Sequence, residues 1–173
     1  IAAIGREPTG GFLLADGAGL GKTRQQLAIA DYYASRGKKV LIIAPNEVVK
    51  PDYKTGKVVG SYDDDGRAMG IKFKLSKGGD GLKGGEITMA TYQNIDKFTE
   101  SVDMDTVVLF DEAHLLKNKA SKRSKAGMDL IDKAGGVLYA TATPADKPEH
   151  LHYLYRIDRS GREGISAFTR HLG

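Results

Sequence analysis

Residues 13–25 read LLADGAGLGKTRQ, an apolar run followed by a glycine-rich turn and a Lys-Thr pair. The usual phosphate-binding loop has a glycine, any four residues, and then Gly-Lys followed by serine or threonine. Gly21, Lys22 and Thr23 match the end of that pattern, but Asp16 occupies the position of its first glycine. The stretch therefore predicts a phosphate-binding loop between a strand and a helix, with one departure to explain.

A loop of this kind binds phosphate through consecutive main-chain N–H groups at the start of a helix, whose dipole also favours anions. Its glycines give the turn the backbone freedom that it needs. The Lys22 ammonium is expected to reach the β- and γ-phosphates, and the Thr23 hydroxyl to bind Mg²⁺. The residues predicted to bind the nucleotide are Gly17, Ala18, Gly19, Leu20, Gly21, Lys22 and Thr23.

Asp16 lies where the predicted strand ends, before the amides that surround the phosphates. A side chain at this point is compatible with phosphate binding if it points away, because a carboxylate beside a triphosphate would be repelled. We therefore expect Asp16 to point away from the nucleotide. The alternative is that a glycine-rich turn between a strand and a helix carries Lys-Thr by chance.

A second motif, VVLFDEAH at 107–114, is an apolar run that ends in two adjacent carboxylates. Such a pair is what a nucleotide-hydrolysing site requires. Asp111 is expected to hold Mg²⁺, and Glu112 to orient and deprotonate the attacking water. By itself an acidic pair at a strand end is more often a solvated turn. Together with the upstream loop, it indicates a catalytic site formed by Lys22, Asp111 and Glu112.

The rest of the chain alternates between strand patterns and helix patterns, with a polar, glycine-rich region between about residues 50 and 85. This alternation predicts a single α/β domain over 1–173, with a mainly parallel sheet covered by helices on both faces. Strands are predicted within 11–16, 39–45, 71–75, 86–92, 105–114 and 136–144, and helices within 22–37, 121–134 and 148–157.

The composition limits the class of protein. Hydrophobic residues make up 40% and charged residues 28%, which argues against disorder. The sequence has no run as long as a membrane span and no signal peptide at its start. The absence of cysteine excludes disulfides and thiolate metal sites and suits the reducing cytoplasm, where we expect the protein. Because the chain begins at Ile1 without methionine, we expect it to be part of a longer protein.

The charge favours polyanionic partners slightly. The net charge is +4, and the basic side chains gather in KNKASKRSK, residues 117–125. This run is interpreted either as a surface that follows a nucleic-acid backbone or as a solvated helix start.

Five motifs in this order resemble the first RecA-like domain of superfamily two helicases and translocases. They are ADGAGLGKT, LIIAP, ATYQ, DEAH and TATP. Asp16 before Gly19, Gly21 and Lys22 resembles the Swi/Snf-type loop, in which an acid habitually begins the motif. DEAHLLKNKASKRSK is similar to the corresponding Swi/Snf segment. GGFLLADGAG at the start and the chain from ATATPADKPEHLHYLYRI onward are similar to strawberry-notch-like helicases and their bacterial or phage relatives.

The resemblance covers the chain from about residue 10 onward and implies a RecA-like P-loop NTPase domain. The implied activity is ATP hydrolysis with Mg²⁺, coupled to movement on nucleic acid, double-stranded DNA in particular. The implied partner domain is a second RecA-like unit that supplies an arginine finger. The resemblance also implies that His114, Thr141 and Thr143 couple the nucleotide site to the nucleic-acid face, and that nucleic acid is contacted by Pro45, Asn46, Thr91, Tyr92 and Gln93.

Two features of the family pattern are missing from this sequence. There is no second RecA-like domain, and no glutamine motif for adenine precedes the loop, because Gln25 and Gln26 lie after it. Three alternatives stay open. They are the motor of a restriction-modification or phage-defence enzyme, a nucleotide-gated DNA-binding module without hydrolysis, and a phosphate-loop ATPase unrelated to nucleic acid.

Overall fold

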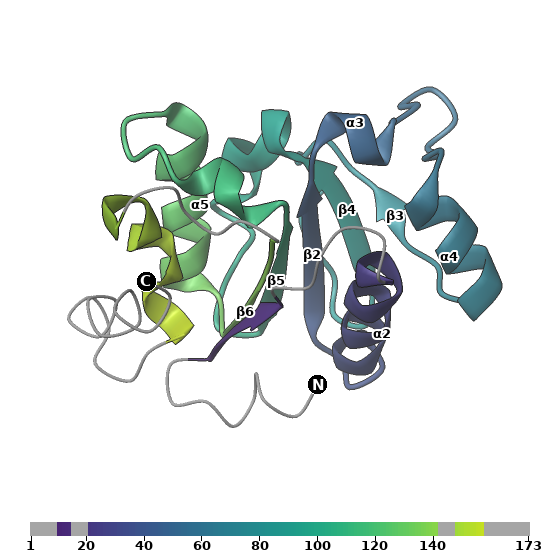
Figure 1. Ribbon diagram of the computed structural model, residues 1–173. Coiled ribbons are helices and arrows are strands. Elements are labelled where there is room, and N and C mark those ends of the chain that lie inside the picture. Colours follow the sequence, from purple (N-terminus) through teal and green to yellow (C-terminus); the bar gives the residue numbers. More distant parts are fainter. Residues whose placement is uncertain (1–9, 15–20, 142–147, 158–173) are drawn as a thin grey trace.

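Six strands form one sheet in the part of the chain that the structure describes, which is residues 10–14, 21–141 and 148–157 (Figure 1). The structure is a computed structural model. The strand order is β1-β6-β5-β2-β4-β3, and every neighbouring pair is parallel. The mainly parallel α/β sheet predicted from the sequence is therefore confirmed. The strands are β1 Gly11–Leu14, β2 Lys39–Ala44, β3 Lys74–Leu75, β4 Ile87–Thr91, β5 Thr106–Asp111 and β6 Gly136–Ala140.

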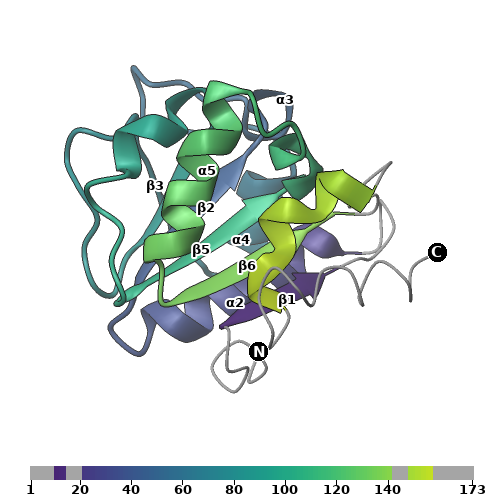
Figure 2. The same cartoon turned by 90° about the vertical axis from the view of Figure 1, so that its left-hand side faces the viewer.

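Helices cover both faces of this sheet. In Figure 1, α2 and α4 lie on one side of the strands and α5 on the other. Figure 2 shows α5 crossing in front of the sheet with η3 beside it. The α-helices are α2 Lys22–Ala34, α3 Asn46–Val49, α4 Ser61–Met69 and α5 Lys122–Lys133, and the 3₁₀ helices are η1 Tyr92–Phe98, η2 Ala113–Leu116 and η3 Pro148–Ile157.

The central strand β2 shows why its sequence is a continuous apolar run. Leu41 and Ile43 belong to the hydrophobic cluster under α5 and η1. Val40 and Ile42 belong to the opposite cluster, under α2 and α4. A strand buried on both faces needs apolar side chains at every position, unlike a strand with one solvated face. The sheet is therefore buried on both faces, and the loops that follow its strands are held where the strands end.

Helix α2 agrees closely with the pattern read from the sequence. The predicted inward residues Leu27, Ala30 and Ala34 are all buried. Gly21 precedes the helix with φ 76° and ψ 23°, a left-handed conformation that favours glycine. A Cβ built at Gly21 would meet no atom within 4 Å, so the backbone angle, and not space, calls for glycine here.

Helix α4 was not predicted from the sequence. The sequence interpretation left residues 61–69 in a polar region, whereas they form nine residues of helix. Tyr62 and Gly66 are buried and Met69 is half-buried, a spacing of four and three that marks one helical face. Gly70, with φ 68°, ends the helix in the left-handed conformation. These two signals together indicate the helix.

The predicted strand over 71–75 is largely wrong. Only Lys74 and Leu75 pair with β4, opposite Thr88 and Met89. Ile71 and Phe73 instead pack, half-buried, against the cluster under α2. The segment does alternate between more buried apolar and exposed polar side chains, but most of it does not pair with the sheet.

The helix predicted over 148–157 is a 3₁₀ helix, η3. Its Arg156 guanidinium donates to the carbonyl oxygens of Ile131 at 2.7 Å, Ala134 at 2.8 Å and Gly135 at 3.3 Å. These carbonyls lie at the C-terminal end of α5 and just beyond it, where a cation is favoured by the helix dipole. Arg156 thereby fastens η3 beside α5.

Ser121 is the N-cap of α5, as predicted, and its Oγ accepts the N–H of Ser124 at 3.0 Å. We expect Ser121→Ala to lower the free energy of unfolding by about 1 kcal/mol, the usual cost of losing an N-cap. Urea unfolding followed by circular dichroism measures this. Ser35→Ala is the control, because the exposed Ser35 hydroxyl donates to the Tyr32 carbonyl and caps no helix start. A loss no larger than that of Ser35→Ala would contradict the capping role.

Candidate active site

The carboxyl ends of the strands meet at one edge of the sheet, because all the strands are parallel. Leu14 of β1 and Asp111 of β5 are both in register with Ala140 of β6, which lies between them. The end of β1 that leads to the glycine-rich loop and the acidic end of β5 therefore flank the end of β6. This topology places the two predicted motifs at the same edge.

Lys22 brings the two motifs into contact. Its Nζ lies 2.5 Å from Glu112 Oε1 and 3.2 Å from Asp111 Oδ1. Partial burial lowers the pKa of Lys22, but the Glu112 hydrogen bond and the Asp111 charge outweigh burial and raise the pKa overall. Lys22 therefore stays charged at neutral pH. The structure unites the three residues predicted to be catalytic.

Asp111 is buried, with 2% of its surface exposed, and its two oxygens differ. Oδ2 accepts a hydrogen bond from the Tyr62 hydroxyl at 2.8 Å. Oδ1 is buried and has no hydrogen-bond partner within the described residues, although it lies close to the Lys22 ammonium. A buried carboxylate oxygen with free acceptor capacity suits Mg²⁺ or a water bound to it. The predicted role of Asp111 is compatible with this geometry.

The rest of a metal site is not preformed by carboxylates. Among the described residues, no group of three or more histidine, cysteine, aspartate or glutamate side chains is arranged to hold a metal. Mg²⁺ commonly takes one or two protein ligands and fills its shell with phosphate oxygens and water. Thr23, half-buried in the first turn of α2, and Asp111 are the residues that would hold it.

Tyr62 was not identified from the sequence. It is fully buried, and burial first, then the charge of Asp111, raise its pKa well above the usual range. Tyr62 is therefore a permanent hydrogen-bond donor. Its oxygen also lies 3.3 Å from Gln26 Oε1, and Gln26 Nε2 is buried without a partner in the described chain. The single Tyr62 hydroxyl proton is used in the bond to Asp111. If the side-chain amide of Gln26 is rotated by half a turn, Nε2 takes the place of Oε1 and donates a hydrogen bond to the Tyr62 oxygen.

Glu112 has an uncommon backbone conformation for its residue type, with φ 53° and ψ 48°. This left-handed region is disfavoured for residues other than glycine and persists only where surrounding contacts hold it. The side chain is 34% exposed, so the carboxylate that binds Lys22 is also accessible to water. Access to water is what a residue that activates water requires.

His114 and Thr141, two of the residues predicted to couple the sites, are in contact. His114 Nδ1 lies 3.0 Å from Thr141 Oγ1 and 3.5 Å from Glu112 Oε2. The histidine thus bridges the acid motif of β5 and the end of β6. Thr143, the third predicted residue, lies outside the described residues.

Several predicted nucleotide contacts also lie outside the described residues. They are Gly17, Ala18, Gly19 and Leu20, and Asp16 lies with them. Gly21, Lys22 and Thr23 are described and start α2 as predicted. The residues that adjoin the loop on both sides are thus in the positions that a phosphate-binding loop needs, while the contacts of the loop itself stay a prediction.

The residues predicted to touch nucleic acid lie at the end of β4 or directly after β2 and β4, at the same sheet edge. The side chains of Pro45, Thr91 and Tyr92 are buried, whereas those of Asn46 and Gln93 are exposed. Contacts by the first three would therefore use the main chain. Asn46 and Gln93 are the members of this set whose side chains are open to a partner.

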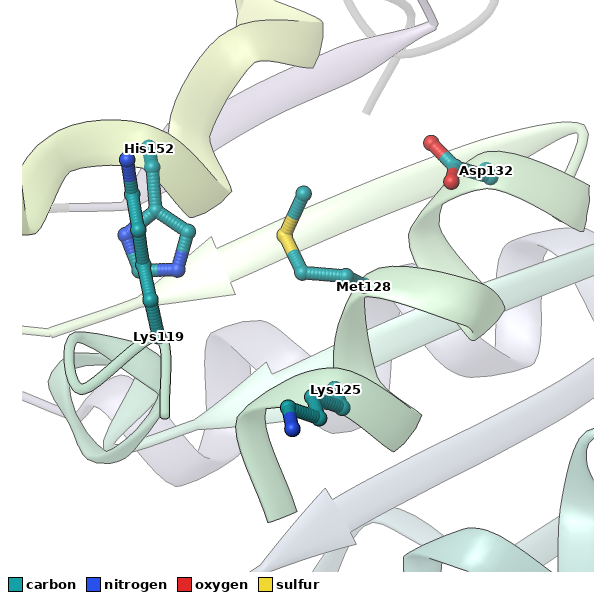
Figure 3. Close-up of a pocket in the computed structure, with 5 residues that line it drawn as sticks. All are labelled: Lys119, Lys125, Met128, Asp132 and His152. Carbon is teal, nitrogen blue, oxygen red and sulfur yellow. The ribbon is translucent and has the colours of Figure 1, made fainter. Parts of the chain in front are cut away.

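A separate cavity of about 360 Å³ lies between α5 and η3 (Figure 3). Figure 3 shows Met128 at its centre, with His152 and Lys119 on one side and Asp132 on the other. None of its lining residues belongs to the predicted nucleotide site.

No helix in the described part of the chain is long and apolar enough to cross a membrane.

A parallel sheet, a lysine at the start of the first helix and an acid pair at the end of β5 define a P-loop domain of the RecA-like class. More specifically, the chain belongs to the family described as type III restriction enzyme, res subunit, which matches residues 4–146.

Individual relatives agree with the resemblance read from the sequence. The chain is 30% identical over 152 residues to the SWI/SNF-related matrix-associated actin-dependent regulator of chromatin subfamily A-like protein 1 of Xenopus tropicalis, covering 87% of this chain and 15% of that protein. It is 30% identical over 166 residues to protein strawberry notch homolog 2 of Mus musculus, covering 85% and 12%. The chain therefore spans a small part of these relatives.

A solved structure supports the same assignment. The Sulfolobus solfataricus SWI2/SNF2 ATPase core in complex with dsDNA superposes with a TM-score of 0.67 at 26% identity, covering 92% of this chain and 34% of that one. The predicted resemblance to Swi/Snf-type and strawberry-notch-like helicase domains is confirmed. The domain is thus of a helicase and ATPase type.

Proposed function

We propose that this chain is the ATP-binding half of an ATP-dependent motor that moves on nucleic acid, double-stranded DNA in particular. The observation that carries the proposal is the contact of Lys22 with both Asp111 and Glu112. A phosphate-binding lysine and a water-activating carboxylate then lie within reach of one γ-phosphate. The similar Sulfolobus protein is an ATPase core in complex with dsDNA, which supports the choice of partner.

In the proposed reaction each residue has a distinct task. Lys22 binds the β- and γ-phosphates, and Asp111 and Thr23 hold Mg²⁺. Mg²⁺ held by these residues would supply positive charge that neutralises the phosphate oxygens. Glu112 accepts the proton of the attacking water. His114 contacts both Glu112 and Thr141, so it connects the proposed base to the residue that follows β6.

The test measures the release of phosphate from ATP, in the presence of Mg²⁺, by the motor that contains this chain and its second RecA-like domain. Double-stranded DNA, single-stranded DNA and RNA are compared at equal nucleotide concentration. Displacement of a third strand from a DNA triplex reports movement. Stimulation by duplex DNA together with triplex displacement is expected. ATP binding with no effect of any nucleic acid would overturn the proposal.

The chain by itself should bind Mg-nucleotide weakly and hydrolyse it very slowly. The transition-state charge normally needs an arginine from the partner domain, which is worth on the order of 10³ to 10⁵ in rate in related phosphate-loop enzymes. Phosphate release by residues 1–173, compared with the two-domain motor at equal concentration, checks this. Robust nucleic-acid-stimulated hydrolysis by the chain alone would contradict it.

A further inference from the structure

Tyr92 connects the turn after β4 to the acid motif of β5. It is the first residue of η1, and only 5% of its surface is exposed. Its hydroxyl donates to the main-chain oxygen of Asp111 at 2.7 Å. Burial, followed by the charge of Asp111, raises the pKa of Tyr92 well above the usual range, so the phenol keeps its proton. The bond spans the end of β2, which lies between β4 and β5.

The acceptor of this bond is the carbonyl directly before Glu112. The Asp111 carbonyl and the Glu112 N–H belong to one planar peptide unit, so fixing that oxygen fixes the plane from which φ of Glu112 is measured. That φ is 53°, in the left-handed region, which costs a residue other than glycine on the order of 1–3 kcal/mol. The Tyr92 bond is therefore one of the contacts that hold Glu112 in a conformation it would not favour by itself.

The other side of Tyr92 faces a surface. A cavity of about 270 Å³ is lined by Tyr92, Gln93, Ile95, Asp96, Lys122 and Arg123. The Arg123 guanidinium lies 5.8 Å from the Tyr92 ring centroid. Arg123 Nε also donates to the Leu115 carbonyl at 3.1 Å, in the short helix η2 that follows Glu112. The cavity is thus connected to the chain on both sides of Glu112.

The charge of this cavity suits a phosphodiester group. Gln93, Lys122 and Arg123 are exposed and supply an amide and two cations. The opposing charge is Asp96, whose carboxylate lies 3.6 Å from Lys122 Nζ. Since that pair is loose and mostly exposed, a phosphate can replace the carboxylate as the partner of Lys122. Phosphate contacts of this kind carry little sequence information, as a motor on nucleic acid requires.

We propose that Tyr92 is a positioning residue for Glu112, and that it links phosphodiester binding at Gln93, Lys122 and Arg123 to the water-activating carboxylate. This inference rests on the proposed function for the role of Glu112. A phosphate at the cavity draws Arg123 and the start of η1 together, and the Tyr92 hydroxyl transmits the change to the Asp111–Glu112 peptide. Nucleic acid thereby sets the orientation of the residue that activates water.

Tyr92→Phe tests the inference, because it removes one oxygen and keeps the ring. In the two-domain motor, kcat at saturating nucleic acid should fall about three- to tenfold, which matches one hydrogen bond felt in the transition state. KM for ATP and the nucleic-acid concentration for half-maximal stimulation should stay within about twofold, because no contact with either ligand is lost. Arg123→Ala should instead raise that concentration at least about threefold.

Tyr139→Phe is the matched control. Tyr139 is a buried tyrosine of β6 in the same hydrophobic cluster, and its ring packs against those of Phe110 and Tyr153, contacts that phenylalanine keeps. Equal kcat for Tyr92→Phe and the wild type, or an equal loss in Tyr139→Phe, would overturn the inference. A wild-type motor that binds ATP but ignores nucleic acid would overturn the proposed function instead.

A second readout needs no activity. Hydrogen–deuterium exchange on this chain should show faster exchange of the η2 amides in Tyr92→Phe, by about threefold or more, and unchanged exchange in Tyr139→Phe. The Leu115 N–H in η2 bonds to the Glu112 carbonyl at 3.0 Å, so it reports directly on the Glu112 backbone. Unchanged η2 exchange in Tyr92→Phe would show that the hydroxyl does not hold Glu112 and would overturn the inference.

Discussion

Glu112→Gln should block ATP hydrolysis, with kcat of the two-domain motor about 10² to 10⁴ lower, the usual contribution of a positioned general base. Nucleotide affinity should stay within about threefold of the wild type. Glutamine keeps the shape of glutamate and can still accept a hydrogen bond from Lys22, but it cannot take a proton from water. The loss belongs to the chemical step, in which the water is deprotonated, and not to ground-state binding.

Single-turnover phosphate release and titration with a fluorescent nucleotide separate these two effects. Glu86→Gln is the control, because Glu86 is an exposed carboxylate just before the start of β4, at the opposite end of that strand from Tyr92. If Glu112→Gln reduced affinity as much as it reduced hydrolysis, Glu112 would be a binding residue and the proposed base would lie elsewhere.

The geometry of the candidate active site was predictable to the extent that it depends on strand order and motif position. A phosphate-binding loop after one strand and an acid pair after another must meet at the same edge if the sheet is parallel. The contact of Lys22 with Asp111 and Glu112 follows from that rule. So does the pairing of His114 with Thr141, since β5 and β6 are neighbours.

The positioning tyrosines were not predictable in the same way. Tyr62 lies on helix α4, which the sequence interpretation left as loop. Nothing in the predicted elements therefore placed Tyr62 near Asp111. Tyr92 was named from the resemblance only as a nucleic-acid contact, and nothing in the sequence indicated that its hydroxyl bonds to a main-chain oxygen inside the protein. A main-chain acceptor leaves no mark on the sequence, because every residue type supplies one. Such bonds become visible only when the packing of η1 against the strands is known.

The two tyrosines also explain how two neighbouring carboxylates at the end of β5 can have different proposed roles, Asp111 with the metal and Glu112 with water. Tyr62 fixes the Asp111 side chain, and Tyr92 fixes its main chain. With Asp111 held at both points, the backbone of the next residue is kept in the left-handed conformation in which its carboxylate meets Lys22 and water. Rigid support of one carboxylate is thus what allows the left-handed turn that exposes the other.

Lys22→Ala should weaken nucleotide binding at least tenfold, which corresponds to about 1.4 kcal/mol. The lysine supplies the charge that meets the ground-state phosphates, and its loss also leaves Asp111 and Glu112 without the cation that contacts both. The triphosphate would then approach two carboxylates whose charge is not compensated. Part of the loss of affinity should therefore come from this repulsion, in addition to the lost contact between the lysine and the phosphates.

Fluorescent-nucleotide titration of Lys22→Ala, with Lys38→Ala as the control, measures this loss. The Lys38 ammonium pairs with Asp105 at 2.8 Å on the surface, so its removal should leave affinity unchanged. Adding Glu112→Gln to Lys22→Ala should recover part of the affinity, because one of the two uncompensated charges disappears. Recovery in the double variant identifies carboxylate repulsion as part of the loss. If the double variant binds no better than Lys22→Ala, the lysine acts on the phosphates alone, and its contacts with the acid pair do not matter for binding.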